Sequence, residues 1–109
     1  HIPANAPLNP TTLYGSSKAS GFLLSNSLSK KEGQKLIYTR IFTAYGDGQN
    51  INNFWPLLKK KALAGENFLM TNGQQLRDFI SADLVAKDLV RLISYKDIEE
   101  GYPMVLNIG

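Results

Sequence analysis

Tyr14 and Lys18 are the two residues of this chain whose types and spacing best suit chemistry. They stand four positions apart in the stretch YGSSK, and residues at i and i+4 share one face of a helix. A tyrosine hydroxyl is a poor base at neutral pH, but an ammonium group one turn away favours the phenolate. Such a pair can protonate a carbonyl oxygen, or deprotonate an alcohol, while a hydride moves elsewhere.

The spacing by itself is a weak signal, because the sequence holds 5 tyrosines and short motifs also match by accident. The plain alternative is a surface helix with a partly buried Tyr14 and a solvated Lys18. Three later stretches accompany it in order along the chain and favour the chemical interpretation: RIFTAYG from Arg40, GQQLRDF from Gly73, and NIG from Asn107.

YGSSK and these three stretches are four sequence landmarks. With them, the chain resembles the extended short-chain dehydrogenase/reductases, and among them the NAD-dependent sugar-nucleotide epimerase/dehydratase family. The resemblance covers nearly the whole chain. It implies an α/β fold, the late part of a Rossmann-like doubly wound parallel sheet plus part of a small α/β substrate-binding region. Residues 1–50 would hold the last Rossmann helix and strand. Residues 51–109 would form a partial substrate-binding region with a returning helix and strand.

The resemblance also implies cofactor and catalytic residues. Tyr14 would be the acid/base, and Lys18 would hold the phenolate and hydrogen-bond the nicotinamide ribose, so both would be catalytic and cofactor-binding. The backbone of Phe42 would lie beside the nicotinamide. The cofactor would be NAD or NADP, and the reaction would be hydride transfer at a sugar carbon by an epimerase, dehydratase or 4-ketoreductase.

Substrate binding is implied for Thr43, Tyr45 and Arg77. Arg77 would grip the diphosphate of a nucleotide-diphosphate sugar, since a guanidinium fork suits phosphate oxygens. The alternative for Arg77 is a salt bridge to Asp78 or Asp83. Thr43 stands where many family members have Asn, which weakens its match, and Tyr45 is equally suited to packing. Family members often dimerise, which predicts a homo-oligomer.

Two parts of the family pattern have no counterpart in these residues. The sequence contains no Gly-x-x-Gly-x-x-Gly phosphate loop, and only 13 residues precede Tyr14, too few to hold the family's upstream catalytic Ser/Thr. We therefore expect an internal piece of a longer enzyme that is inactive by itself. The alternative is a non-catalytic nucleotide-sugar-binding or regulatory protein on the same fold.

Composition narrows the function classes. A net charge of +3 suits a phosphate-bearing ligand but falls short of a nucleic-acid-binding signature. The absence of cysteine excludes disulfides and thiolate chemistry, and a single histidine, His1, argues against a histidine metal site. No apolar run approaches the roughly 18 residues of a membrane helix. These features predict a cytoplasmic protein without metal, membrane or nucleic-acid partners.

Hydrophobic periodicity and turn residues predict the elements that position these groups. A helix capped by Thr11 or Thr12 should run to Ser29 or Lys30, with broad burial against a sheet and a partner subunit. A buried strand should follow over 35–42, and a second helix over 52–64. Beyond it we expect a short strand at 68–70, a hairpin turn at Asn72-Gly73 leading into 75–80, a helix over 83–94 and a last strand over 104–108.

Overall fold

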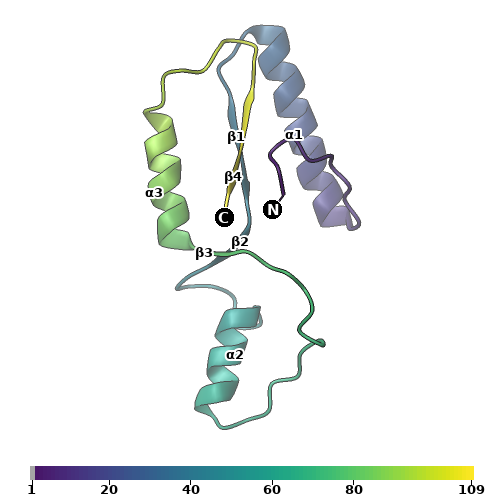
Figure 1. The fold of residues 1–109 in the computed structure, drawn as a ribbon, viewed down its shortest axis with the longest axis vertical. Coiled ribbons are helices and arrows are strands. Elements are labelled where there is room, and N and C mark those ends of the chain that lie inside the picture. The colour runs from purple at the N-terminus through teal and green to yellow at the C-terminus, as the bar shows by residue number, and fades with distance from the viewer. Residues whose placement is uncertain (1) are drawn as a thin grey trace.

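The computed structural model describes residues 2–109, and His1 lies outside them. The fold alternates strands and helices, with α1 and α3 on either side of a parallel strand pair and α2 set apart at one end (Figure 1). In chain order the elements are α1 (Leu13–Glu32), β1 (Ile37–Ile41), β2 (Thr43–Tyr45), α2 (Phe54–Leu63), β3 (Phe79–Ser81), α3 (Ala82–Ile93) and β4 (Met104–Ile108). The mixed α/β class with parallel strands confirms the predicted fold class.

The strands form two parallel pairs rather than one continuous sheet. β1 pairs with β4, from Ile37 opposite Met104 to Ile41 opposite Ile108. β2 pairs with β3, with Thr43 opposite Phe79. Phe42 lies between β1, which pairs with β4, and β2, which pairs with β3. Its N–H still donates to the Ile108 carbonyl of β4 at 2.9 Å. The single strand predicted over 35–42 is therefore shorter than expected, and the chain beyond it forms an unpredicted second strand.

Two predictions in the middle of the chain are wrong. Residues 68–70 form no strand, and Asn72-Gly73 starts no hairpin. Within this region Phe79–Ser81 forms a strand, β3, which pairs with β2 in the parallel direction, across the connection that contains α2. The Asn72-Gly73 turn signal predicted pairing with a neighbouring segment, but the actual partner lies far away in the sequence. Parallel strands must be joined by a long crossover, and local sequence does not reveal which strand lies at its other end.

Polar side chains cap two of the helix starts, and of these the Thr12 cap was predicted. The Thr12 hydroxyl accepts from the Gly15 N–H at 3.0 Å, and Gly33 ends α1 in the left-handed conformation at φ 63°. Ser81 caps α3 by accepting from the Leu84 N–H at 3.3 Å. Asn53 stands at the start of α2 without a side-chain capping bond.

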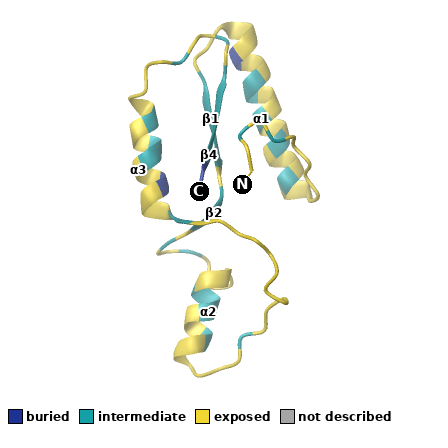
Figure 2. Cartoon of the chain, viewed as in Figure 1, coloured by how far each residue is buried: buried dark blue, intermediate teal, exposed yellow. Residues whose placement is uncertain are grey.

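Burial is sparse throughout the described residues (Figure 2). Val85 and Ile108 are the buried hydrophobic residues, and Ser29 is the buried polar one. The expected broad burial of α1 is not seen, since Leu13 is 92% and Leu24 71% exposed. One face of α1 meets β1, and nothing within residues 2–109 covers the other. None of the helices in this part of the chain is both long and apolar enough to cross a membrane.

Candidate functional site

The Tyr14–Lys18 pair lies in the first two turns of α1, on one face of the helix. The Lys18 ammonium is 5.4 Å from the centre of the Tyr14 ring, close enough for a cation–π attraction. The Tyr14 side chain is open to an incoming ligand, because the residue is 73% exposed. The helix starts just before Tyr14 because Thr12 caps it, so the local sequence itself puts the phenol and the ammonium one turn apart.

A cavity of about 610 Å³ contains both side chains. Its other walls come from the extended segment at Pro7–Pro10 and from β1, where Tyr38, Thr39, Arg40 and Ile41 contribute. The Tyr14–Lys18 pair therefore faces the carboxyl half of a parallel strand, the edge at which open α/β sheets bind ligands. Sequence reasoning did not predict the roles of Phe22, Tyr38 and Arg40 in this wall.

The remaining predicted residues follow β1 along the chain. Phe42 sits at the change of strand partner, and its ring lies so close to Gly109 that a Cβ there would collide with it. The Thr43 N–H donates to the Asp78 carbonyl at 3.2 Å. Tyr45 belongs to a different, larger cavity than Tyr14 and Lys18.

Arg77 lies in the exposed loop before β3, two residues from the Phe79 that pairs with Thr43. Its guanidinium donates twice to the Gln75 side-chain oxygen, at 3.3 and 3.0 Å. The alternative salt bridge to Asp78 or Asp83 is not formed in the described part of the chain. Arg77 lines neither of the two cavities.

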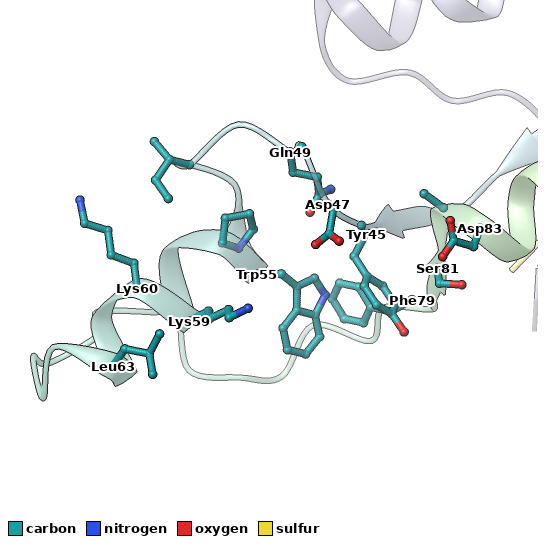
Figure 3. Close-up of a pocket in the computed structure, with 15 residues that line it drawn as sticks. Tyr45, Asp47, Gln49, Trp55, Lys59, Lys60, Leu63, Phe79, Ser81 and Asp83 are labelled. Atoms are coloured by element: carbon teal, nitrogen blue, oxygen red, sulfur yellow. The ribbon is translucent and has the colours of Figure 1, made fainter.

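The larger cavity, about 1110 Å³, opens between β2, the start of β3 and α2. Figure 3 shows Tyr45, Trp55 and Phe79 grouped together, with Lys59, Lys60 and Leu63 on the α2 side and Ser81 and Asp83 on the α3 side. The Trp55 ring centre lies 5.9 Å from that of Tyr45 and 5.3 Å from that of Phe79. Lys59 and Lys60 are exposed at the rim, whereas Lys61 pairs with Glu66.

The aromatic group was not predicted as a unit. Its members are separated in sequence, and β2–β3 pairing brings Phe79 to the same place as Tyr45. Aromatic enrichment at Phe54, Trp55, Phe68 and Phe79 was the available signal. No cluster of three or more possible metal ligands occurs among residues 2–109.

Comparison with known proteins identifies the class that this fold and these residues belong to. The model of the NAD dependent epimerase/dehydratase family matches residues 2–109. The chain therefore belongs to this family, and the resemblance inferred from the four landmarks is confirmed. No curated protein sequence matches it.

A solved structure gives a more specific likeness. The chain is similar to dTDP-glucose 4,6-dehydratase from Bacillus anthracis str. Ames, crystallised in complex with NAD, with 28% sequence identity and a TM-score of 0.83. The match covers 100% of this chain and 34% of the dehydratase chain. This chain thus spans about a third of that enzyme's length, within a Rossmann-like dehydratase fold.

Proposed function

We propose that this chain is part of an NAD(P)-dependent enzyme that transfers hydride at a carbon of a nucleotide-diphosphate sugar, as an epimerase, dehydratase or 4-ketoreductase. The observation that carries the proposal is the Tyr14–Lys18 pair, whose ammonium lies 5.4 Å from the phenol ring centre. The pair faces the carboxyl half of a parallel strand in a chain of this family. The dehydratase likeness supports the sugar-nucleotide substrate class.

Each predicted residue takes a part in this proposal. Tyr14 accepts the proton of a sugar hydroxyl as the hydride leaves the same carbon, and returns a proton in the reverse step. Lys18 stabilises the phenolate. Arg77 binds the diphosphate, while Thr43 and Tyr45 contact the substrate further along the strand. By this proposal residues 1–50 form the last Rossmann helix and strand, and residues 51–109 form a partial substrate-binding region with a returning helix and strand.

The residues of this chain fit one end of the cofactor. Lys18 is exposed in the smaller cavity, and the Phe42 backbone lies at the carboxyl end of β1. Gly109 leaves the room that the Phe42 ring occupies. Lys18 and Phe42 would hold the nicotinamide end, and NAD or NADP would supply the hydride acceptor. The pyrophosphate would need a glycine-rich turn at a helix start, which this sequence lacks.

The decisive experiment is Tyr14→Phe in the full-length protein. Removing the hydroxyl removes the proton carrier but leaves the ring and its packing, so kcat should fall by about 100-fold or more. The Kd for NAD or NADP should stay nearly unchanged. Steady-state kinetics with nucleotide sugars, paired with calorimetric titration of the cofactor, would measure both.

Tyr102→Phe is the matched control, because Tyr102 is exposed in the loop before β4 and outside both cavities. It should leave kcat unchanged. Wild-type kcat in Tyr14→Phe would remove Tyr14 from the mechanism. Nucleotide-sugar binding without any turnover by the wild-type protein would favour the non-catalytic alternative.

A further inference from the structure

The extended segment of residues 2–10 is fastened to the sheet at two points. The Arg40 guanidinium donates through Nη1 to the Ala6 carbonyl at 3.1 Å. The Asn107 amide donates through Nδ2 to the Ile2 carbonyl at 2.6 Å. Arg40 on β1 and Asn107 on β4 are register partners, so their side chains leave the same face of the sheet. Two neighbouring side chains thus hold one segment across one face.

Arg40 also joins this face to α1. Its guanidinium carbon lies 5.3 Å from the centre of the Phe22 ring. That ring in turn meets Tyr38 edge to face, at 4.7 Å between centres and 65° between planes. Phe22 is one helical turn after Lys18, and Tyr38 precedes Arg40 by two positions on β1, on the same strand face. The half-buried Arg40 side chain therefore connects its own strand, β1, to both α1 and the segment.

The segment carries this contact to the Tyr14–Lys18 pair. Its Pro7–Pro10 part forms a wall of the cavity that contains both side chains. Pro10 also lies close to α1 beside Tyr14, since a Cβ on Gly15 would stand 3.3 Å from the Pro10 Cβ. Prolines at positions 3, 7 and 10 restrict the backbone. A short, stiff segment held at Ile2 and Ala6 therefore has little freedom at Pro10.

We infer that Arg40 is a positioning residue for the Tyr14–Lys18 site: through the Ala6 carbonyl and the Phe22 ring it holds the 2–10 segment and α1 in register, with Asn107 as its second anchor. This inference rests on the proposed function, because positioning matters only if Tyr14 reacts. A purely structural Arg40 would affect stability and leave the turnover of folded protein unchanged.

The test compares Arg40→Met with Arg40→Lys in the full-length protein. Methionine replaces the aliphatic stem of the arginine side chain but removes the donors and the charge, whereas lysine keeps a donor and a cation for Phe22. For Arg40→Met we expect kcat to fall roughly tenfold, since small misplacements of reacting groups are costly, while KM for the nucleotide sugar changes less than about twofold. Arg40→Lys should recover most of kcat.

Arg91→Met is the matched control. Arg91 is exposed on α3 and pairs at the surface with Asp88, so its loss should not change kcat. Asn107→Leu removes the second anchor with little change in volume. It should lower kcat in the same direction, and its effect should fall short of additivity with Arg40→Met, because both variants release the same segment.

Hydrogen–deuterium exchange of the 2–10 segment gives a readout that does not depend on catalysis. Exchange at the Ala6 amide, which donates to the Pro3 carbonyl at 3.0 Å, should be faster in Arg40→Met than in Arg40→Lys or wild type. Faster exchange with unchanged kcat would overturn the positioning role, and unchanged exchange would overturn the anchor itself.

Two further outcomes separate this inference from the proposed function. If Tyr14→Phe keeps wild-type kcat while exchange responds to Arg40→Met, the proposed function fails and the anchor stands, although nothing is positioned for catalysis. If Arg40→Met does not fold, Asn107→Leu decides. An exchange increase with a kcat loss in Asn107→Leu supports the inference, and wild-type exchange and kcat in Asn107→Leu overturn it.

Discussion

At the scale of single residues, the Arg77 side chain is hydrogen-bonded to the neutral side chain of Gln75, so no carboxylate of residues 2–109 neutralises its charge there. Its guanidinium donates through Nε and Nη2 to the one neutral side-chain oxygen of Gln75, and the same two N–H groups can donate to two phosphate oxygens. We predict that Arg77→Lys in the full-length protein raises the Kd for a nucleotide-diphosphate sugar about tenfold, because a point charge replaces a planar fork. The Kd for NAD should change little.

Arg91→Lys is the control for Arg77→Lys, since its ion pair with Asp88 is solvent-exposed and such pairs contribute little. Titration calorimetry with the nucleotide sugar would measure both variants. An unchanged Kd in Arg77→Lys would assign Arg77 to the local structure of its loop.

What could be predicted for single residues follows from the range of their contacts. The Tyr14–Lys18 pair depends on helical periodicity and on the Thr12 cap two residues before Tyr14, both visible in the sequence. The Arg40–Ala6 bond joins residues 34 positions apart, and the Asn107–Ile2 bond joins residues 105 apart. No local pattern encodes such partners, so the attachment of the 2–10 segment to the sheet could be seen only in the structure.

At the scale of elements, Ser29 joins the end of α1 to the start of β1. It is 2% exposed, and its hydroxyl donates to the Gln34 carbonyl at 2.6 Å just past the left-handed Gly33. Ser29→Ala should lower the free energy of unfolding by about 1 kcal/mol, because the Gln34 carbonyl then keeps the Gly101 N–H but loses the Ser29 hydroxyl as a donor. Urea unfolding of the full-length protein would measure the loss.

Ser27→Ala is the control, because Ser27 lies on the exposed side of the same helix and alanine is the better helix former. It should leave stability unchanged or slightly raised. Equal stability of the Ser27→Ala and Ser29→Ala variants would show that the Gln34 bond contributes nothing to this junction.

Helices were predictable where end signals or a periodic apolar face mark them, whereas the short strands were not. The helix over 13–32 has the Thr12 cap and the Gly33 stop, and the helix over 82–93 has a periodic apolar face, so both begin within one residue of the prediction. The three-residue strands β2 and β3 carry little pattern. Their pairing depends on the crossover through α2, and this is why a hairpin was predicted at Asn72-Gly73 in its place.

At the scale of the whole molecule, the described residues are more open than an independent domain of this length. The radius of gyration is 17.4 Å, whereas a compact chain of this length would have roughly 13 Å. The accessible surface is 8744 Å², against about 6,000 Å² for a folded monomer of this mass. Two-stranded parallel sheets with open edges are also rare alone, since parallel sheets are normally covered on both faces.

This openness gives the last prediction, that residues 1–109 by themselves neither bind NAD nor turn over substrate. With Val85 and Ile108 as the buried hydrophobic residues of the described chain, too little apolar surface is removed from water to offset the entropy of ordering. The open edge of β1 would favour pairing between copies. Lys18 and Phe42 would reach only one end of the cofactor, and no glycine-rich turn would hold its pyrophosphate.

Three measurements on the isolated 109-residue chain test this expectation: thermal melting by circular dichroism, light scattering and calorimetric titration with NAD and NADP. We expect a broad, non-cooperative melt, self-association as concentration rises and no measurable heat of cofactor binding. The full-length protein is the control and should melt cooperatively and bind its cofactor. Micromolar NAD binding by a monomeric, cooperatively melting 109-residue chain would contradict the prediction, and a phosphate site would then have to exist among these residues.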